Sequence, residues 1–172
     1  MEKYKISNKI IDPLKNFEGD IEYQSNKKKS FIDGKFRIHD DGARYPTIGY
    51  GHKIKSNELE RFKDGISSAE AEQLLREDLD NVENDLNRIF KTPLSQNEVD
   101  ALGSFIFNVG GGANVSNSNT VYMINKNLDF NPITGKTLEE EFKEWNTSKG
   151  QVLNGLIDRR NKEWEIFSNG NY

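Results

Sequence analysis

Residues 38–52, IHDDGARYPTIGYGH, concentrate the polar groups that could carry out chemistry. The segment holds both histidines of the chain, two adjacent aspartates and a threonine. A carboxylate from Asp40 or Asp41 could act as an acid or a base, and the hydroxyl of Thr47 could hold a water molecule. Adjacent aspartates in a turn more often cap the turn than catalyse a reaction. If one of these aspartates is catalytic, the other half of an acid–base pair must be a carboxylate from elsewhere in the chain.

Glu18 is the candidate for that second carboxylate. It lies between Phe17 and Gly19, where a short helix is expected to end. Partial burial beside an aromatic ring would favour the protonated carboxyl that a general acid requires. The alternative is a solvated glutamate at a helix end, which is the usual setting of this residue type.

The histidines also admit a metal site. His39, Asp40, Asp41 and His52 are chemically suitable zinc ligands. No HExxH pair or comparable spacing accompanies them, so a metal site is not expected. His52 is instead expected to be structural and to pair with a carboxylate on the acidic helix described below.

The composition excludes some kinds of chemistry and argues against nucleic-acid and membrane partners. The chain has 172 residues and no cysteine, which excludes disulfides and a cysteine nucleophile. The net charge of -4 argues against a nucleic-acid partner. The mean hydropathy is -0.83, and no apolar run approaches the roughly 20 residues that a membrane-spanning helix needs. The N-terminal stretch lacks the long apolar core of a secretory signal, so no signal peptide is expected.

The sequence before residue 66 contains one segment with a helical pattern and one without. Residues 8–18 predict a short helix, with Asp12 as its N-cap and Pro13 at the first helical position. From residue 20 to about 65 the helical period is absent, and Asp33-Gly34 predicts a hairpin because both positions favour positive φ. We expect a small β-rich lobe here.

Capping boxes mark the helices that follow. Ser67-x-x-Glu70 opens an acidic helix of about 22 residues, which would span roughly 33 Å. A second box at residues 95–98 opens a helix that ends at Gly110, and further helices are expected near 119–126, 138–146 and 154–168. The predicted architecture is one α+β domain over residues 1–172. It comprises a β-rich lobe (about 19–65), a linking helix (about 67–90) and a helical lobe (about 91–172 plus the N-terminal helix).

Five blocks of the sequence resemble the phage-type lysozymes, or endolysins, of glycoside hydrolase family 24. They are FEG, PTIGYGH, ISSAEAEQLLREDL, LSQNEVDALGSFIFNVGGG and GLIDRRNKEWEIFSNG. The blocks occur in the family's order and cover nearly the whole chain. The resemblance implies a lysozyme-like fold and a muramidase that cleaves the β-1,4 bond between N-acetylmuramic acid and N-acetylglucosamine. It implies no metal and no organic cofactor.

The resemblance also implies catalytic roles. The family's acid, aspartate and threonine match Glu18, Asp41 and Thr47, and Asp41 is preferred over Asp40 because the family places five residues between the aspartate and the threonine. One departure is marked: the family separates its two carboxylates by about eight residues, whereas 22 residues, 19–40, lie between them here. An enlarged hairpin would accommodate the extra residues.

Other positions follow from the same resemblance. Phe107, Asn108 and Arg159 match substrate-facing positions of the family. His52 matches a histidine that pairs with an aspartate on the long helix, for which Asp78 is the corresponding residue. The pair is expected to be structural.

The resemblance leaves the biological setting open among an endolysin, a tail lysozyme and a secreted antibacterial effector. The expected partner is bacterial peptidoglycan, the expected state is a monomer, and no inhibitor or immunity protein can be named. The protein is expected to be made in the host cytoplasm and to act on the cell wall after release. The alternatives are a lytic transglycosylase acting on the same bond and a noncatalytic peptidoglycan-binding module.

Overall fold

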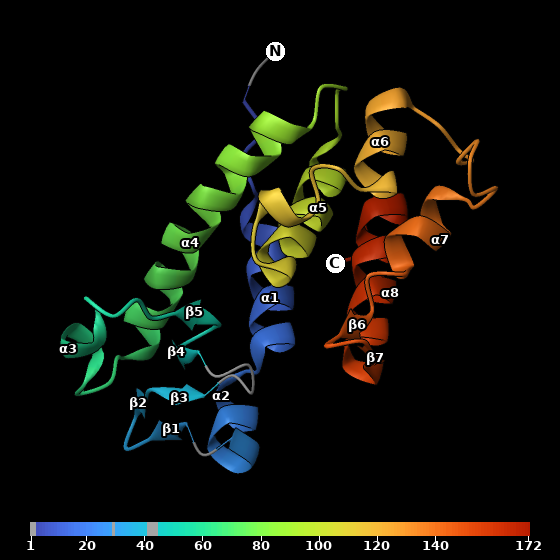
Figure 1. Ribbon diagram of the computed structural model, residues 1–172. Helices are drawn as coiled ribbons and strands as arrows, with labels where there is room; N and C mark the ends of the chain where they lie inside the picture. The colour runs from blue at the N-terminus through green and yellow to red at the C-terminus, as the bar shows by residue number, and fades with distance from the viewer. Residues whose placement is uncertain (1–2, 29, 41–44) are drawn as a thin grey trace. The chain divides into compact units, whose positions relative to one another are not determined.

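The computed structural model describes residues 3–28, 30–40 and 45–172, which form two compact units. One unit is Asp12–Asp80, and the other joins Met1–Ile11 to Asn81–Tyr172. The chain passes between the units within helices α1 (Ile11–Glu18) and α4 (Ser68–Ile89) (Figure 1). Among the described residues, no helix has both the length and the apolar character needed to cross a membrane.

The N-terminal helical segment covers residues 8–18, as predicted, but its cap differs from the prediction. Ser7 caps a short 3-10 turn, η1 (Asn8–Ile10), which runs directly into α1. The prediction that Asp12 caps the helix is wrong, because Asp12 lies within the first turn of α1. Pro13 fits the same turn because backbone N–H groups there have no intrahelical partner.

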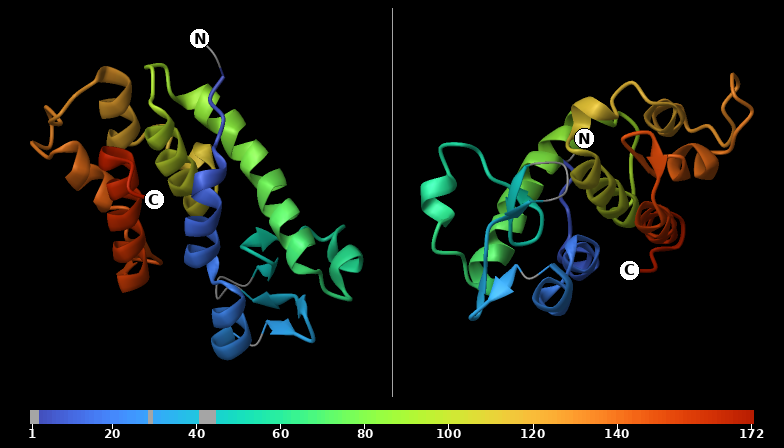
Figure 2. Two further views of the ribbon diagram at one scale, coloured as in Figure 1. Left: turned by 180° about the vertical axis from the view of Figure 1, so that it is seen from behind. Right: turned by 60° about the horizontal axis from the view of Figure 1, so that its bottom comes forward.

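The unit Asp12–Asp80 contains the predicted hairpin and a small sheet. β1 (Phe31–Ile32) pairs with β2 (Lys35–Phe36), and the turn residues have φ of 51° and 74°. β3 (His39–Asp40), β4 (Pro46–Ile48) and β5 (His52–Lys53) form an antiparallel sheet with β4 in the centre. Figure 2 shows β4 and β5 beside the first half of α4.

This unit also contains helical turns that the sequence analysis did not predict. They are α2 (Ile21–Tyr23), the π-helical turn η2 (Gln24–Lys28) and α3 (Leu59–Phe62). Asp20 caps α2 by accepting a hydrogen bond from the backbone N–H of Tyr23 at 2.8 Å. The fully buried side chain of Gln24 donates to the carbonyls of Gly19 (2.7 Å) and Gly49 (3.0 Å). Polar contacts therefore stabilise α2 and η2, and the apolar periodicity of the sequence does not reveal such contacts.

The long helix α4 spans 22 residues, as predicted. The backbone N–H of Ser67 donates to the Glu70 carboxylate at 2.7 Å, and the N–H of Glu70 donates to the Ser67 hydroxyl at 3.2 Å. This capping box confirms the predicted start. The apolar side chains on one stripe of α4 are buried and include Leu74, Leu75, Leu79, Val82 and Leu86.

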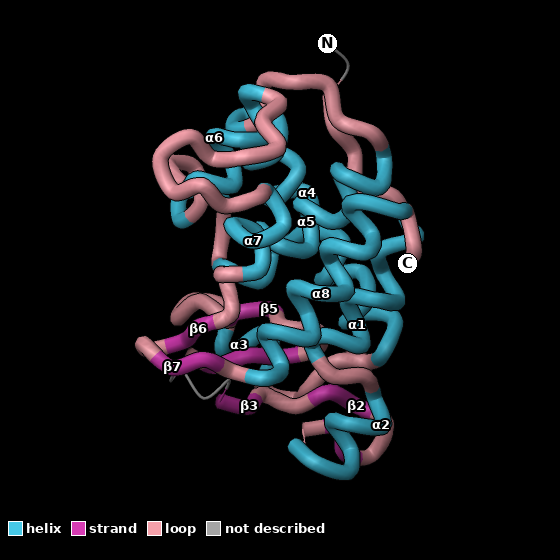
Figure 3. Tube along the Cα trace, turned by 90° about the vertical axis from the view of Figure 1, so that its right-hand side faces the viewer, coloured by secondary structure: helices cyan, strands magenta, loops and turns pink. Residues whose placement is uncertain are grey.

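The second unit is mainly helical. Its elements are α5 (Gln96–Val109), η3 (Gly112–Asn114), α6 (Asn119–Lys126), α7 (Leu138–Lys143), β6 (Thr147–Ser148), β7 (Gln151–Val152) and α8 (Asn154–Asn169). α5 is buried over most of its length and packs chiefly against α8. The predicted α+β class is confirmed. α7 ends three residues before the end of the helix predicted for 138–146, and the β6–β7 hairpin, which was not predicted, follows it (Figure 3).

Candidate active site

Glu18 ends α1 with its carboxylate directly against the backbone of Gly51. A Cβ atom placed on Gly51 would lie 2.7 Å from Oε2 of Glu18, closer than a carbon can approach an oxygen. Gly51 also has φ of 85°, a conformation that favours glycine. The turn between β4 and β5 therefore needs glycine here both for its backbone and for the half-buried carboxylate packed on it.

Thr47 lies on the central strand β4 and is only 4% exposed. Its backbone is paired with His39 of β3 and Lys53 of β5. The hydroxyl of Thr47 donates to the carbonyl of Tyr45 at 3.1 Å, so its oxygen lone pairs are left to accept hydrogen bonds. The sheet thus fixes the threonine within the unit that contains Glu18.

The predicted aspartate, Asp41, lies outside the described residues. Asp40 is the last residue of β3, where it is exposed and paired with Pro46. β3 and β4 thus bring Asp40 beside the strand that carries Thr47.

His52 and Asp78 make the contact that the sequence predicted. Nδ1 of His52 lies 2.8 Å from Oδ2 and 3.0 Å from Oδ1 of Asp78. The other ring nitrogen, Nε2, lies 3.8 Å from a carboxylate oxygen of Glu58, and the ring packs edge-on against Phe62. The pair joins β5 to α4, and the His52 side chain is only 12% exposed.

The surroundings of His52 raise its pKa. Burial is the largest influence and lowers the pKa, but the hydrogen bond and negative charge of Asp78, with the charge of Glu58, outweigh burial. The folded state therefore holds the proton more tightly than the unfolded chain does. The resulting stabilisation is complete below the unfolded pKa of about 6.5 and is lost as the pH rises through the folded value.

His52→Asn is expected to lower the free energy of unfolding by about 1.5–3 kcal/mol at pH 5, the range for hydrogen bonds to charged groups, and by less at pH 8. Urea unfolding at the two pH values measures this difference. His39→Asn is the matched control, because it makes the same change at the other histidine, which lies on β3 and whose Nδ1 lies 3.3 Å from the carbonyl of Arg37. Equal stability of His52→Asn and wild type at pH 5 would contradict a stabilising pair.

A second ion pair also fastens the Asp12–Asp80 unit, and the sequence analysis missed it. Nζ of Lys15, one helical turn before Glu18, lies 2.5 Å from a carboxylate oxygen of Glu72 on α4. Hydrogen bonds from Lys15 and Arg76 lower the pKa of Glu72. The same Nζ lies 5.6 Å from the centre of the Tyr50 ring. α1 and β5 are thus each tied to α4 by an ion pair, and no sequence spacing rule links Lys15 to Glu72.

In the other unit, Asn108 lines a pocket of about 690 Å³ near the end of α5. The lining also includes Asn119, Glu141, Trp145, Thr147 and Ser148. Phe107 is half-buried and does not belong to this lining. The pocket offers an aromatic ring beside hydroxyl and amide groups, a combination suited to a polar ligand with apolar faces.

Arg160 fixes the orientation of the Asn108 amide. A terminal guanidinium nitrogen of Arg160 lies 2.7 Å from Oδ1 of Asn108. Because arginine can only donate, the contacted atom of Asn108 must be its oxygen. The NH₂ group of the amide therefore remains for other partners.

Arg159 and Arg160 are buried with Glu163 between α5 and α8. Their exposures are 4%, 0% and 0%, in that order. Nε of Arg159 donates to Oε1 of Glu163 at 3.0 Å, and the Ser104 hydroxyl donates to the same oxygen at 2.6 Å. Nε of Arg160 lies 2.9 Å from Oε2 of Glu163 but is not aligned for a hydrogen bond. This burial favours a structural role for Arg159 over the predicted contact with substrate.

Within residues 3–28, 30–40 and 45–172, no three histidine, aspartate or glutamate side chains gather in a way that could hold a metal ion. The residues considered for the candidate chemistry are Glu18, Thr47 and the aspartate pair at residues 40–41.

Sequence comparison places these residues in a family. The model of the phage lysozyme family matches residues 32–163, most of the chain. The chain belongs to the phage lysozyme family. The match includes Thr47, His52 and Asn108, whereas Glu18 precedes it.

Individual relatives of the chain are endolysins and a muramidase domain. The endolysin of Bacillus phage B103 is 35% identical over 127 residues, covering 74% of this chain and 44% of the relative. The chain thus spans less than half the length of that relative. The solved endolysin from Escherichia coli O157:H7 phage FAHEc1 has a TM-score of 0.73 at 28% identity, covering 99% of this chain and 98% of its own. The muramidase domain of SpmX from Asticaccaulis excentricus has a TM-score of 0.70 at 27% identity, covering 96% and 98%. These likenesses confirm the predicted lysozyme-like fold.

Proposed function

We propose that this phage lysozyme hydrolyses bacterial peptidoglycan at the β-1,4 bond between N-acetylmuramic acid and N-acetylglucosamine. The observation that carries the proposal is the Glu18 carboxylate at the end of α1, packed against Gly51 in the unit that also positions Thr47. Relatives named as endolysins and as a muramidase domain support the same substrate. Hydrolysis of a glycosidic bond needs a carboxylic acid and a second group that handles the attacking water.

The proposed steps assign one role to each catalytic side chain. Glu18 protonates the leaving oxygen as the glycosidic bond breaks. Asp41 takes a proton from a water molecule, and the oxygen of that water bonds to the anomeric carbon through a transition state resembling an oxocarbenium ion. Thr47 orients the water by accepting a hydrogen bond from it, since the threonine proton is already donated to the Tyr45 carbonyl. The expected stereochemical outcome is inversion.

Asn108 is the proposed donor to the substrate in the helical unit. Arg160 holds Oδ1 of Asn108, so the amide presents its NH₂ group to the surroundings. An acetamido or peptide carbonyl of the glycan strand would accept from that group. Arg160 is then a positioning residue that acts through Asn108. Phe107 is retained as a neighbouring contact, while Arg159 is assigned to the buried ion cluster.

The setting of the reaction is part of the proposal. Peptidoglycan is the proposed partner of a monomeric enzyme that is made in a host cell and reaches the wall after release. Relatives that are phage endolysins support this setting.

Product analysis tests the proposed reaction. The wild-type protein is expected to clear a suspension of purified peptidoglycan and to release muropeptides with reducing ends, each heavier by one water than the anhydro product. Mass spectrometry of the released muropeptides makes this measurement. Anhydro products would indicate a lytic transglycosylase instead, and binding without release would indicate a noncatalytic module.

A further inference from the structure

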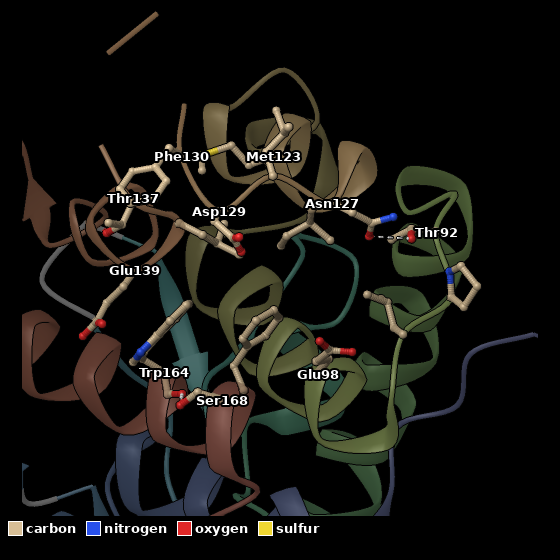
Figure 4. A pocket seen from close by; sticks show the side chains of 16 residues that line it. Thr92, Glu98, Met123, Asn127, Asp129, Phe130, Thr137, Glu139, Trp164 and Ser168 are labelled. Carbon is tan, nitrogen blue, oxygen red and sulfur yellow. Dashed lines mark hydrogen bonds between the residues drawn. The ribbon is translucent and has the colours of Figure 1, made fainter. Parts of the chain in front are cut away.

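A second pocket lies wholly within the unit that contains Asn81–Tyr172. Its volume is about 590 Å³, and it is formed where α5 and α7 begin and α6 and α8 end (Figure 4). None of the residues assigned to hydrolysis lines it. The volume falls within the usual range of about 300–1,000 Å³ for binding pockets.

Apolar side chains form much of the pocket lining. Met123 and Ile124 of α6 are 0% and 5% exposed. The ring of Trp164 stacks on that of Phe167, with centroids 5.3 Å apart and planes 18° apart. In Figure 4 the Met123 and Trp164 side chains border the same space. The half-buried indole of Trp164, which packs on Phe167, suits contact with a bulky apolar group or a cation.

Acidic side chains line the same pocket. They are Glu98, Asp129 and Glu139, and no lysine or arginine is among the described residues that line it. Glu98 accepts a hydrogen bond from the N–H of Ser95 in the capping box of α5, and Glu139 lies 2.5 Å from Nζ of Lys143. The exposed Asp129 carboxylate has no hydrogen bond or ion pair to any residue that the structure describes.

A buried carboxylate holds one edge of the pocket in place. Glu141 is 5% exposed and accepts hydrogen bonds from Asn131 at 2.9 Å and from Thr134 at 2.6 Å. These contacts fix the segment 127–137, which displays Phe130 and Ile133 at 64% and 88% exposure. The segment extends the apolar surface outward, and fixing it before binding lowers the entropic cost of docking.

We propose that this pocket docks a segment of a partner protein that presents a basic side chain beside a bulky apolar one. The apolar group would pack on Trp164 and Met123, and the cation would pair with Asp129. Charge complementarity selects this occupant, because the exposed Asp129 carboxylate has no cationic partner among the residues that the structure describes and would repel anionic partners such as the carboxylates of peptidoglycan peptides. Exposed Phe130 would add contact area at the rim.

NMR titration of the full chain with a synthetic peptide tests the proposal. The probe is an amphipathic peptide with leucine and phenylalanine on one face and arginine on the other. Amide shifts are expected at Asp129 and Phe130, together with a shift of the Trp164 indole N–H. Asp129→Asn is expected to weaken binding about two- to fivefold, the scale for losing one exposed ion pair. Peptidoglycan hydrolysis by this variant is expected to stay unchanged.

Matched controls separate the pocket from general charge effects. Asp80→Asn removes one exposed carboxylate from α4 outside the pocket and is expected to leave peptide affinity unchanged. A peptide with glutamate in place of arginine is expected not to bind. Equal binding by Asp129→Asn, or shifts spread outside the pocket, would overturn the proposal. Preferential binding of neutral N-acetylglucosamine oligomers in the pocket would overturn it in favour of a glycan site. Loss of hydrolysis in Asp129→Asn would assign the pocket to the enzyme reaction instead.

Discussion

Glu18→Gln is expected to slow peptidoglycan hydrolysis by about 10²–10⁴-fold, the range that general acid catalysis contributes. Glutamine has nearly the same shape as glutamate but carries no acidic proton to transfer to the leaving oxygen. The variant should retain the contact with Gly51, because the amide can occupy the space of the carboxylate. The loss is therefore expected in the chemical step and not in folding or substrate binding.

Clearing of a peptidoglycan suspension at several substrate concentrations measures this effect, with co-sedimentation reporting binding. Glu22→Gln is the matched control, because it makes the same change at an exposed position on α2 in the same unit. The control should clear the suspension at the wild-type rate. If Glu18→Gln also did so, Glu18 would not be the general acid.

Local signals in the sequence predicted much of the fold. The capping boxes at Ser67 and Ser95 place the starts of α4 and α5 because their hydrogen bonds span only three residues. The turn at Asp33-Gly34 is equally local, since its backbone conformation depends on those residue types. Such features need no knowledge of tertiary packing.

The unpredicted helical turns depend on contacts across larger separations. η2 begins at Gln24, whose side chain donates to the carbonyl of Gly49, 25 positions further along the chain. Residues 24–28 have no apolar side chains at helical spacing, so an analysis of the sequence pattern does not predict a helical turn there and assigns the segment to the β-rich lobe. Tertiary polar contacts therefore account for this error.

Some contacts of the candidate site were predicted from the sequence, and others are seen only in the structure. The His52–Asp78 contact follows from the family resemblance and is present. Lys15 and Glu72 belong to no recognised motif, and only the fold brings their charges together. The resemblance predicts that Arg159 faces the substrate, but a buried partner in the same helix, Glu163, permits the burial of this arginine.

Glu163→Gln is expected to lower the free energy of unfolding by about 3–5 kcal/mol, the range for breaking a buried ion pair. The substitution keeps the side-chain volume but removes the anion that lies beside both Arg159 and Arg160. Burial already lowers the pKa of Arg160 to about 10, and the charge of Glu163 opposes that shift. Without the carboxylate, two buried guanidinium groups face each other's charge. The loss would be a large part of the roughly 5–15 kcal/mol that stabilises a typical domain.

Urea unfolding at neutral pH measures the change, and Glu60→Gln provides the control. Glu60 pairs with Lys63 on an exposed surface, where side-chain exposures are 82% and 58%. Water solvates both charges there, so removing one should change stability little. A Glu163→Gln variant as stable as this control would contradict the role of Glu163 as the stabilising counter-ion. A large loss of stability would instead show that the arginines at 159 and 160 depend on one buried carboxylate. The orientation of the Asn108 amide by Arg160 would then depend on the same carboxylate, linking the stability of the helical unit to its proposed contact with substrate.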